Sequence, residues 1–159
     1  VNIYKFTKLN MDTKNRVGVI IYNSEGKFLI EHAPNHYFGD NDWDLPKGHI
    51  GTEDKSKEES AKRECFEETG ILLDNISLIG ETKYKEGTIT LYEAHLEDTY
   101  LKGLSDEEII NNYVECTTYF EADGKKWPEV TNFKFISMEE APKELYKSLV
   151  KVFEELQLI

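Results

Sequence analysis

The strongest constraint in this sequence is a helix whose two ends are both marked and whose buried side is acidic. Ser56 to Gly70 begins with Ser-Lys-Glu-Glu. This is a capping box, in which the Ser56 hydroxyl accepts from an orphan N–H and Glu59 reaches back. Gly70 stands where a left-handed C-terminal stop is expected. Local chemistry therefore predicts one helix with defined ends.

Three glutamates of this helix lie on or beside its apolar stripe. At about 100° per residue, Ala61 and Cys65 define that stripe, and the acids occupy an arc of roughly 100° that borders it. Like charges at these spacings repel, and carboxylates at a buried edge also lose hydration. A bound cation offsets both costs, and clustered carboxylates suit Mg²⁺ or Mn²⁺. The three acids are Glu64, Glu67 and Glu68.

The alternative is that these acids form a solvated face paired with basic neighbours, as in many Glu-rich helices. The surrounding pattern weighs against it. Arg63 to Ile71 reads R-E-C-F-E-E-T-G-I, which resembles the core of the Nudix box, R-E-U-x-E-E-x-G-U with U apolar. Pro46 to Ile50 reads P-K-G-H-I and is similar to the segment that precedes this box in several Nudix subfamilies. The resemblance to the Nudix hydrolase family extends over most of the chain.

One spacing departs from the family pattern G-x5-E-x7-R. Counted from Gly48, the arginine is expected at position 62 but stands at 63. The preceding acidic position falls on Asp54 or Lys55, with Glu53 beside them. The loop therefore carries one inserted residue, and the spacing leaves its acidic partner open.

The resemblance implies Mg²⁺- or Mn²⁺-dependent cleavage of a nucleoside diphosphate linked to another group. It implies metal ligation by Glu67 and Glu68 above all, with the Gly48 carbonyl as a backbone ligand and Glu64 as a ligand or an aid to the water. Glu64 and Glu67 are thereby catalytic, and Arg63 orients the glutamates. Trp43 to Gly48 is similar to the corresponding segment of dinucleoside-polyphosphate and diphosphoinositol-polyphosphate hydrolases. We expect a dinucleoside polyphosphate or a nucleoside triphosphate as substrate. The alternatives are an ADP-ribose or other nucleotide-sugar pyrophosphatase, a non-catalytic nucleotide-binding module, or an acidic interaction protein without metal.

Other residues are candidates for the remaining roles. Glu129, just before a predicted last strand, is the preferred general base, and an exposed turn glutamate is the equal alternative. Lys47 and Lys83 are candidate phosphate contacts, and Trp43 and Tyr84 are candidate base-stacking surfaces. Solvated lysines and core-packed aromatic rings are the alternatives. Further candidates are Glu93, Glu115 and Glu121 for the base and Lys85 for phosphate.

The remaining patterns indicate an α/β fold, a Nudix-type α/β/α sandwich with a mixed sheet. We expect one domain over residues 1–159, because its length suits one domain. Alternating apolar residues predict strands and Pro142 is expected to open the main part of a C-terminal helix. The predicted elements are hairpins at Val17–Tyr22 with Lys27–His32 and Ile76–Tyr84 with Thr88–Leu96, strands at Val114–Glu121 and Phe133–Ile136, and helices at Leu104–Asn112 and Met138–Leu158.

Charge limits the partners. The chain has 19 Lys+Arg against 31 Asp+Glu, a formal net charge of −12. Such a surface repels nucleic-acid duplexes and anionic membranes. A metal-loaded site reverses this locally, so we expect a small-molecule nucleotide as partner. The isolated thiols Cys65 and Cys116 fit a reducing cytoplasm. We expect a cytoplasmic monomer or homodimer.

Overall fold

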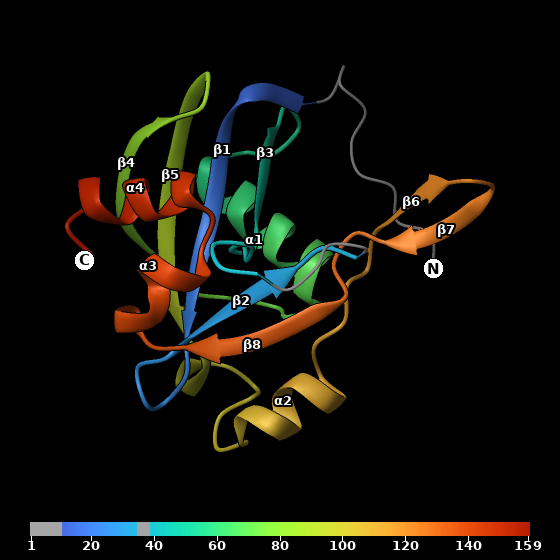
Figure 1. Cartoon of the computed structure of the whole chain (residues 1–159), viewed down its shortest axis with the longest axis vertical. Coiled ribbons are helices and arrows are strands. Elements are labelled where there is room, and N and C mark those ends of the chain that lie inside the picture. The colour runs from blue at the N-terminus through green and yellow to red at the C-terminus, as the bar shows by residue number, and fades with distance from the viewer. Residues whose placement is uncertain (1–10, 35–38) are drawn as a thin grey trace.

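A mixed sheet forms the centre of the computed structural model, which describes residues 11–34 and 39–159 (Figure 1). Its strand order is β4-β5-β1-β2-β8, and β3 also pairs with β1. The β1–β5 pair is parallel, while β1 pairs antiparallel with β2 and β3. The expected mixed sheet is confirmed. The sheet strands are β1 (Met11–Tyr22), β2 (Phe28–His32), β3 (Lys47–Gly51), β4 (Ser77–Tyr84), β5 (Gly87–His95) and β8 (Asn132–Ile136).

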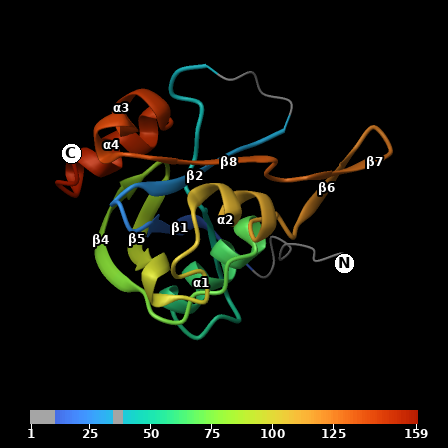
Figure 2. The same ribbon diagram turned by 90° about the horizontal axis from the view of Figure 1, so that it is seen from below.

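Helices cover both faces of the sheet, as the view from below shows (Figure 2). One face packs on α1 and α2, and the other packs on α3 and α4. Alternation along β1 divides the two cores, because Ile20 faces the α4 side whereas Val19 and Ile21 face the α1 side. The helices are α1 (Lys57–Thr69), α2 (Asp106–Asn112), α3 (Ala141–Glu144) and α4 (Lys147–Glu155), with single 3₁₀ turns at Leu96–Asp98 and Met138–Glu140.

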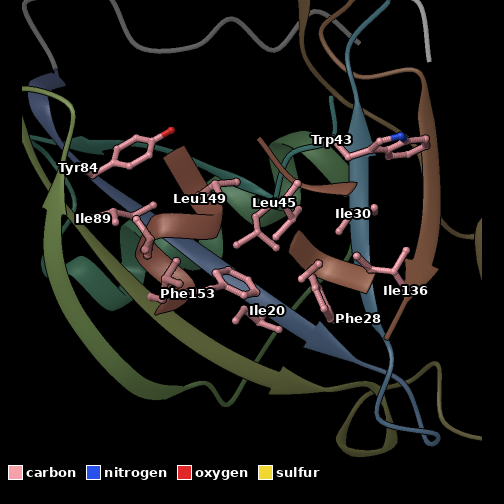
Figure 3. Close-up of a cluster of buried hydrophobic side chains, with 14 residues drawn as sticks. Ile20, Phe28, Ile30, Trp43, Leu45, Tyr84, Ile89, Ile136, Leu149 and Phe153 are labelled. Carbon is pink, nitrogen blue, oxygen red and sulfur yellow. The ribbon is translucent and has the colours of Figure 1, made fainter. Parts of the chain in front are cut away.

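The core on the α4 side is almost entirely apolar (Figure 3). Phe153 and Leu149 of α4 meet Ile20, Phe28 and Leu45 there, and all five are fully buried. Burial of side chains of this size stabilises the fold by about 1.5–3 kcal/mol each. This layer fixes the sheet against which the candidate site is built. In the parts of the chain that the structure describes, no helix is long and apolar enough to cross a membrane.

The two predicted hairpins and the helix at Leu104–Asn112 are confirmed. Tyr22 pairs with Phe28 across the first turn, and Tyr84 pairs with Gly87 across the second. The capping box is half confirmed. The Ser56 hydroxyl accepts from the Glu59 N–H, but Glu59 accepts from the N–H of Lys55 instead of Ser56.

The predicted strand Val114–Glu121 is wrong in its first half. Residues 114–117 are irregular, because they lie against the end of α1, where Glu115 N–H donates to the Thr69 carbonyl at 2.9 Å. The strand begins at Tyr119 as β6 (Tyr119–Ala122). It pairs with β7 (Lys125–Pro128), which the sequence reading missed, in a separate two-stranded hairpin that projects from the body (Figure 1).

The predicted C-terminal helix Met138–Leu158 is also corrected, since it breaks at Leu145 and Tyr146. Leu145 is extended (φ −77°, ψ 151°), and it bridges Trp43. The Trp43 N–H donates to the Glu144 carbonyl at 3.0 Å, and the Tyr146 N–H donates to the Trp43 carbonyl at 2.9 Å. The backbone at the break therefore pairs with the segment that leads into the candidate site.

Candidate active site

The three glutamates of α1 are buried. Glu64 is 1% exposed, Glu67 6% and Glu68 8%, beside the apolar Ala61 and Cys65. The alternative of a solvated acidic face is therefore excluded for these three positions. Unpaired buried charge is costly, so the contacts that compensate it define the site.

Arg63 is the principal positive partner. Its Nη1 donates to Glu67 Oε2 at 2.6 Å and to Glu64 Oε1 at 3.1 Å. Its Nε donates to Asp54 Oδ2 at 3.0 Å, and its Nη2 donates to the His49 carbonyl at 2.9 Å. Burial opposes the charge, but these carboxylates outweigh it and raise the pKa of Arg63. Arg63 thus holds two helix glutamates at fixed orientations.

The structure places Asp54 at the acidic position that the spacing left open. Besides Arg63, Asp54 accepts from the Ser60 hydroxyl at 2.6 Å and from the Gly51 N–H at 3.2 Å. Glu53 is exposed instead. The extra residue therefore lies between Asp54 and Arg63, and the loop absorbs it before the helix begins at Lys57.

Gly48 on β3 lies directly under Glu64. A Cβ atom built at Gly48 would stand 2.0 Å from the Cδ and Oε2 atoms of Glu64. Any side chain at this position would displace that carboxylate from where it lies. The adjacent Lys47 N–H donates to Glu68 Oε1 at 2.9 Å. The close approach of β3 to α1 therefore brings Gly48 together with Glu64 and Glu68.

These donors fit a hard divalent cation. Glu67 Oε1 is buried and accepts no hydrogen bond from the described residues, and the donor set consists of carboxylate oxygens. Three such groups do not converge as a ready-made ion cage anywhere in residues 11–34 and 39–159. Arg63 holds Glu64 and Glu67, and the Lys47 backbone holds Glu68. The site is thus a set of carboxylate oxygens, held in fixed orientations where β3 packs closely against α1.

Glu31 is a buried acid that the sequence reading missed. It is 3% exposed in the middle of β2, where every residue is buried. Burial raises the pKa of Glu31 well above its ordinary value, and the neighbouring Glu68 and Asp44 raise it further. Its side chain is hydrogen-bonded to Glu68, and its Oε1 atom accepts no hydrogen bond from the described residues. The available signal was one acid that directly follows three apolar residues of the strand Phe28–His32.

Glu129 lies between β7 and β8, and hydrogen bonds of the backbone connect its segment to α1. Its N–H donates to the Thr118 carbonyl at 3.1 Å, and the adjacent Thr117 donates to the Glu67 carbonyl through both its N–H (2.8 Å) and its hydroxyl (3.0 Å). Among the three alternatives, Glu93 is on β5 and Glu121 is exposed on the β6–β7 hairpin. The exposed Glu115 contacts α1 at its C-terminal end, where its N–H donates to the Thr69 carbonyl at 2.9 Å, whereas the segment of Glu129 reaches α1 at Glu67. This placement favours Glu129 among the four, and its role as base stays a prediction.

Lys47 and Tyr84 come together beside the glutamates. The Lys47 Nζ atom lies 3.3 Å from Asp44 Oδ2 and 5.8 Å from the centre of the Tyr84 ring. Burial alone lowers the pKa of Lys47, but Asp44, Tyr84 and Glu68 reverse this and raise it above its ordinary value. Lys47 is therefore a fixed cation next to Glu68.

Lys83 and Lys85 are exposed on either side of the buried Tyr84, as the alternation predicts. They line a groove of about 340 Å³ between the end of β4 and helix α4, together with Tyr84, Ser148 and Lys151. Three lysines against the single acid Glu155 make the lining of this groove positive on a protein of net charge −12.

The aromatic candidates are core residues. Trp43 is 6% exposed, its ring meets His32 edge-on at 5.1 Å, and the Lys134 Nζ atom lies 4.5 Å above it. Tyr84 is 4% exposed, with the Arg16 guanidinium and the Lys85 ammonium over its ring. Both placements favour packing over base stacking, because neither ring presents an open face.

Comparison with known proteins agrees with this geometry. Residues 12–156 match the family model of the NUDIX domain. A 17.7 kDa protein in the e-segB intergenic region of Enterobacteria phage T4 is 29% identical over 121 residues, which cover 72% of this chain and 74% of that protein. An RNA pyrophosphohydrolase of Actinobacillus pleuropneumoniae is 26% identical over 157 residues, which cover 86% of this chain and 69% of that protein.

Solved structures share the fold. The NUDIX domain of Shewanella oneidensis NrtR complexed with ADP ribose superposes with a TM-score of 0.60 at 16% identity, covering 96% of this chain and 92% of that one. A C. elegans Ap4A hydrolase in a binary complex gives a TM-score of 0.51 at 19% identity, and the match covers 91% of this chain and 93% of that one. The α/β sandwich with its mixed sheet is confirmed.

Proposed function

The chain belongs to the NUDIX domain family, and from this premise we propose that it cleaves the pyrophosphate bond of a dinucleoside polyphosphate or a nucleoside triphosphate. It is a pyrophosphohydrolase of the Nudix type. The observation that carries the proposal is the set of three buried glutamates on α1, oriented by Arg63 and by the backbone of Lys47. A helix retains such a costly arrangement for chemistry and not for packing.

We assign metal ligation to Glu64, Glu67 and Glu68, with the Gly48 carbonyl as a fourth oxygen donor. Mg²⁺ or Mn²⁺ bound there would neutralise phosphate charge and activate water. Arg63 orients two of these carboxylates and does not contact substrate. Glu129 accepts the proton of the attacking water as general base.

Substrate phosphates are bound by basic residues beside the glutamates. Lys47 lies next to Glu68, where its fixed ammonium can face a phosphate oxygen. Lys83, Lys85 and Lys151 line the groove beside Tyr84, together with the acidic Glu155. Tyr84 connects the two, because its ring lies 5.8 Å from the Lys47 Nζ atom and also lines the groove, so a chain of several phosphates matches this distribution of charge. The ring of Tyr84 lies under the ammonium groups of Lys47 and Lys85.

The names of the related proteins indicate which substrates to test. Their names include an RNA pyrophosphohydrolase, an Ap4A hydrolase and a domain complexed with ADP ribose. All three ligands contain a phosphorylated nucleoside, so the panel contains a 5′-triphosphorylated RNA, Ap4A, ATP and ADP-ribose. ADP-ribose or nucleotide-sugar hydrolysis is the alternative activity. Nucleotide binding without turnover is the alternative function.

The rest of the proposal concerns the cellular compartment and the oligomeric state of the protein. We place the protein in the cytoplasm as a monomer or homodimer of one domain that spans the chain. The match over residues 12–156 supports the single domain, and two free, buried cysteines suit a reducing compartment.

The test is hydrolysis of the panel with Mg²⁺ or Mn²⁺ by the wild type and by Glu67→Gln and Glu68→Gln. Each variant should lose activity by about 100-fold. Glu58→Gln is the matched control, because Glu58 is exposed in the first turn of the same helix. Equal rates in all four proteins would contradict the site assignment. Nucleotide binding by the wild type without turnover of any substrate would establish the binding module instead.

A further inference from the structure

Arg16, Lys47 and Lys85 form a cluster of cations around the ring of Tyr84, the Tyr84 cluster. We propose that this cluster binds a phosphate group of the substrate beyond the pyrophosphate at the glutamates, with Arg16 as a binding residue outside the helix motif. The role rests on the proposed function, because it concerns the same substrate. It makes the protein prefer chains of three or more phosphates over chains of two.

The first observation is that three positive charges converge on one buried ring. The Arg16 Cζ atom lies 5.6 Å from the centre of the Tyr84 ring, the Lys47 Nζ atom 5.8 Å and the Lys85 Nζ atom 5.3 Å. A single cation gains from an aromatic face, but three cations around one ring also repel one another. Tyr84 lies at the margin of the apolar core on the α4 side (Figure 3), so this repulsion stands next to the core.

The second observation is that most of this charge has no carboxylate partner. Within residues 11–34 and 39–159, Lys47 pairs with Asp44 at 3.3 Å, whereas Arg16 and Lys85 form no ion pair. The chain has 31 Asp+Glu against 19 Lys+Arg, so acids are available in excess to neutralise such a cluster. A bound anion would supply the missing negative charge, and phosphate oxygens accept hydrogen bonds from both guanidinium and ammonium groups.

The third observation is the backbone of Lys85. It lies in the short turn between Tyr84 and Gly87, which pair with each other, and its φ is 52°. This left-handed conformation is unfavourable for a lysine, and Asn or Gly would adopt it more easily. Strained backbone of this kind indicates a role for the side chain that it carries. Here the strained residue carries the ammonium nearest to the ring.

The cluster is connected to the glutamates through Lys47. Gly18 of β1 pairs with Lys47 of β3, and side chains alternate along a strand, so Arg16 lies on the same face of the sheet as Lys47. The Lys47 N–H donates to Glu68 at 2.9 Å, while its ammonium belongs to the cluster. A phosphate next to the pair at the glutamates would therefore meet the cluster.

The cluster also opens to ligands. Tyr84 and Lys85 line the groove of about 340 Å³ between β4 and α4. Arg16 is half-buried and Lys85 is exposed, so both charges remain within reach of a bound molecule.

The experiment measures binding of inorganic tripolyphosphate to the full chain in metal-free buffer by titration calorimetry. Arg16→Met removes the guanidinium and keeps an unbranched side chain, and Arg16→Gln takes its place if the methionine variant does not fold. Lys85→Asn removes the ammonium and suits the left-handed turn. Lys102→Met is the control, because Lys102 is an exposed lysine in the turns between β5 and α2.

We expect the Arg16 and Lys85 variants each to bind tripolyphosphate about 10-fold more weakly, since each loses a charge-assisted hydrogen bond. Lys102→Met should stay within about twofold, because salt screens a distant exposed charge. Lys85→Asn should also melt at the same temperature as the wild type or higher, because its turn is relieved. Variants that bind like the wild type would overturn the proposal, and so would an equal loss in Lys102→Met, which would make net charge the cause.

The preference for longer chains is measured with Mg²⁺ present. In Arg16→Met and Lys85→Asn, the KM for ATP should rise by a larger factor than the KM for ADP-ribose, which has two phosphates. Equal factors would overturn this preference.

The metal-free measurement does not depend on the glutamates and separates the cluster from the proposed hydrolysis. A wild type that hydrolyses the panel but binds no tripolyphosphate would overturn the cluster alone. Binding of tripolyphosphate without any hydrolysis would support the cluster and contradict the proposed enzyme.

Discussion

Two helices that lie on opposite faces of one sheet (Figure 2) bury very different side chains, as their burial patterns show. The helix α4 buries Leu149, Val152 and Phe153, which is the outcome expected of an amphipathic helix. The helix α1 buries Glu64, Glu67 and Glu68 together with small residues. Apolar burial on α4 contributes to stability directly, whereas acidic burial on α1 must be offset by Arg63 and by backbone N–H groups. The difference separates the side of the molecule that stabilises the fold from the side that performs chemistry.

The largest expected effect tests the α4 side. Phe153→Ala removes a fully buried ring that packs against Phe28 at 5.8 Å between ring centres. We expect a loss of about 3–5 kcal/mol in the free energy of unfolding, measured by urea denaturation, with unchanged kcat in the folded fraction. Glu154→Ala, on the exposed side of the same helix, should change stability by less than about 0.5 kcal/mol. A fall in kcat at unchanged stability would contradict the division between the two helices.

The second test removes the positive partner of α1. Arg63→Met leaves Asp54, Glu64 and Glu67 without their shared cation. We therefore expect the free energy of unfolding, measured by urea denaturation in metal-free buffer, to fall by about 2–3 kcal/mol. Added Mg²⁺ should raise the melting temperature of this variant more than that of the wild type, because it supplies the missing charge. Lys62→Met is the matched control on the same turn. If melting without metal does not change, the carboxylates do not depend on Arg63.

A smaller effect concerns the start of α1. The Ser56 hydroxyl accepts a hydrogen bond from the Glu59 N–H at 3.1 Å. Ser56→Ala should therefore lower the free energy of unfolding, measured by urea denaturation, by about 1 kcal/mol. Ser56→Asp restores an acceptor and should recover most of that loss. Because the cap lies outside the glutamate cluster, metal affinity should not change. A change in metal affinity would show that the cap also positions the site.

The smallest effect is a pH dependence on the buried side of α1. Burial raises the pKa of the Cys65 thiol from 9.0 to about 12. A raised folded-state pKa means that the stabilising neutral thiol is fully present below pH 9, and its contribution is lost as the pH rises toward 12. Between pH 8 and pH 10 the wild type should lose about 1 kcal/mol more stability than Cys65→Ala. Parallel urea-denaturation profiles over this range would contradict the assignment.

Much of the candidate site follows from patterns within a few residues. The caps of α1, its apolar stripe and the motif around Glu64, Glu67 and Glu68 all depend on spacings of one to four residues, which are visible in the chain. The two hairpins depend on short turns in the same way. Apart from the second half of the capping box, where Glu59 accepts from Lys55 instead of Ser56, these features were predicted correctly because local hydrogen bonds and side-chain periodicity determine them.

The tertiary structure decided what depends on contacts between distant segments. The break at Leu145 arises from pairing with Trp43, and the same packing buries the Trp43 ring. The choice of Asp54 over its neighbours is made by Arg63, after the helix has fixed the position of the guanidinium. Glu31 meets Glu68 because β2 lies beside the segment that leads into β3. The sequence by itself therefore determined the family, the fold class and the acidic helix, since these rest on local patterns. Long-range packing decided how those acids are held, because no short spacing encodes which distant side chain will lie against them.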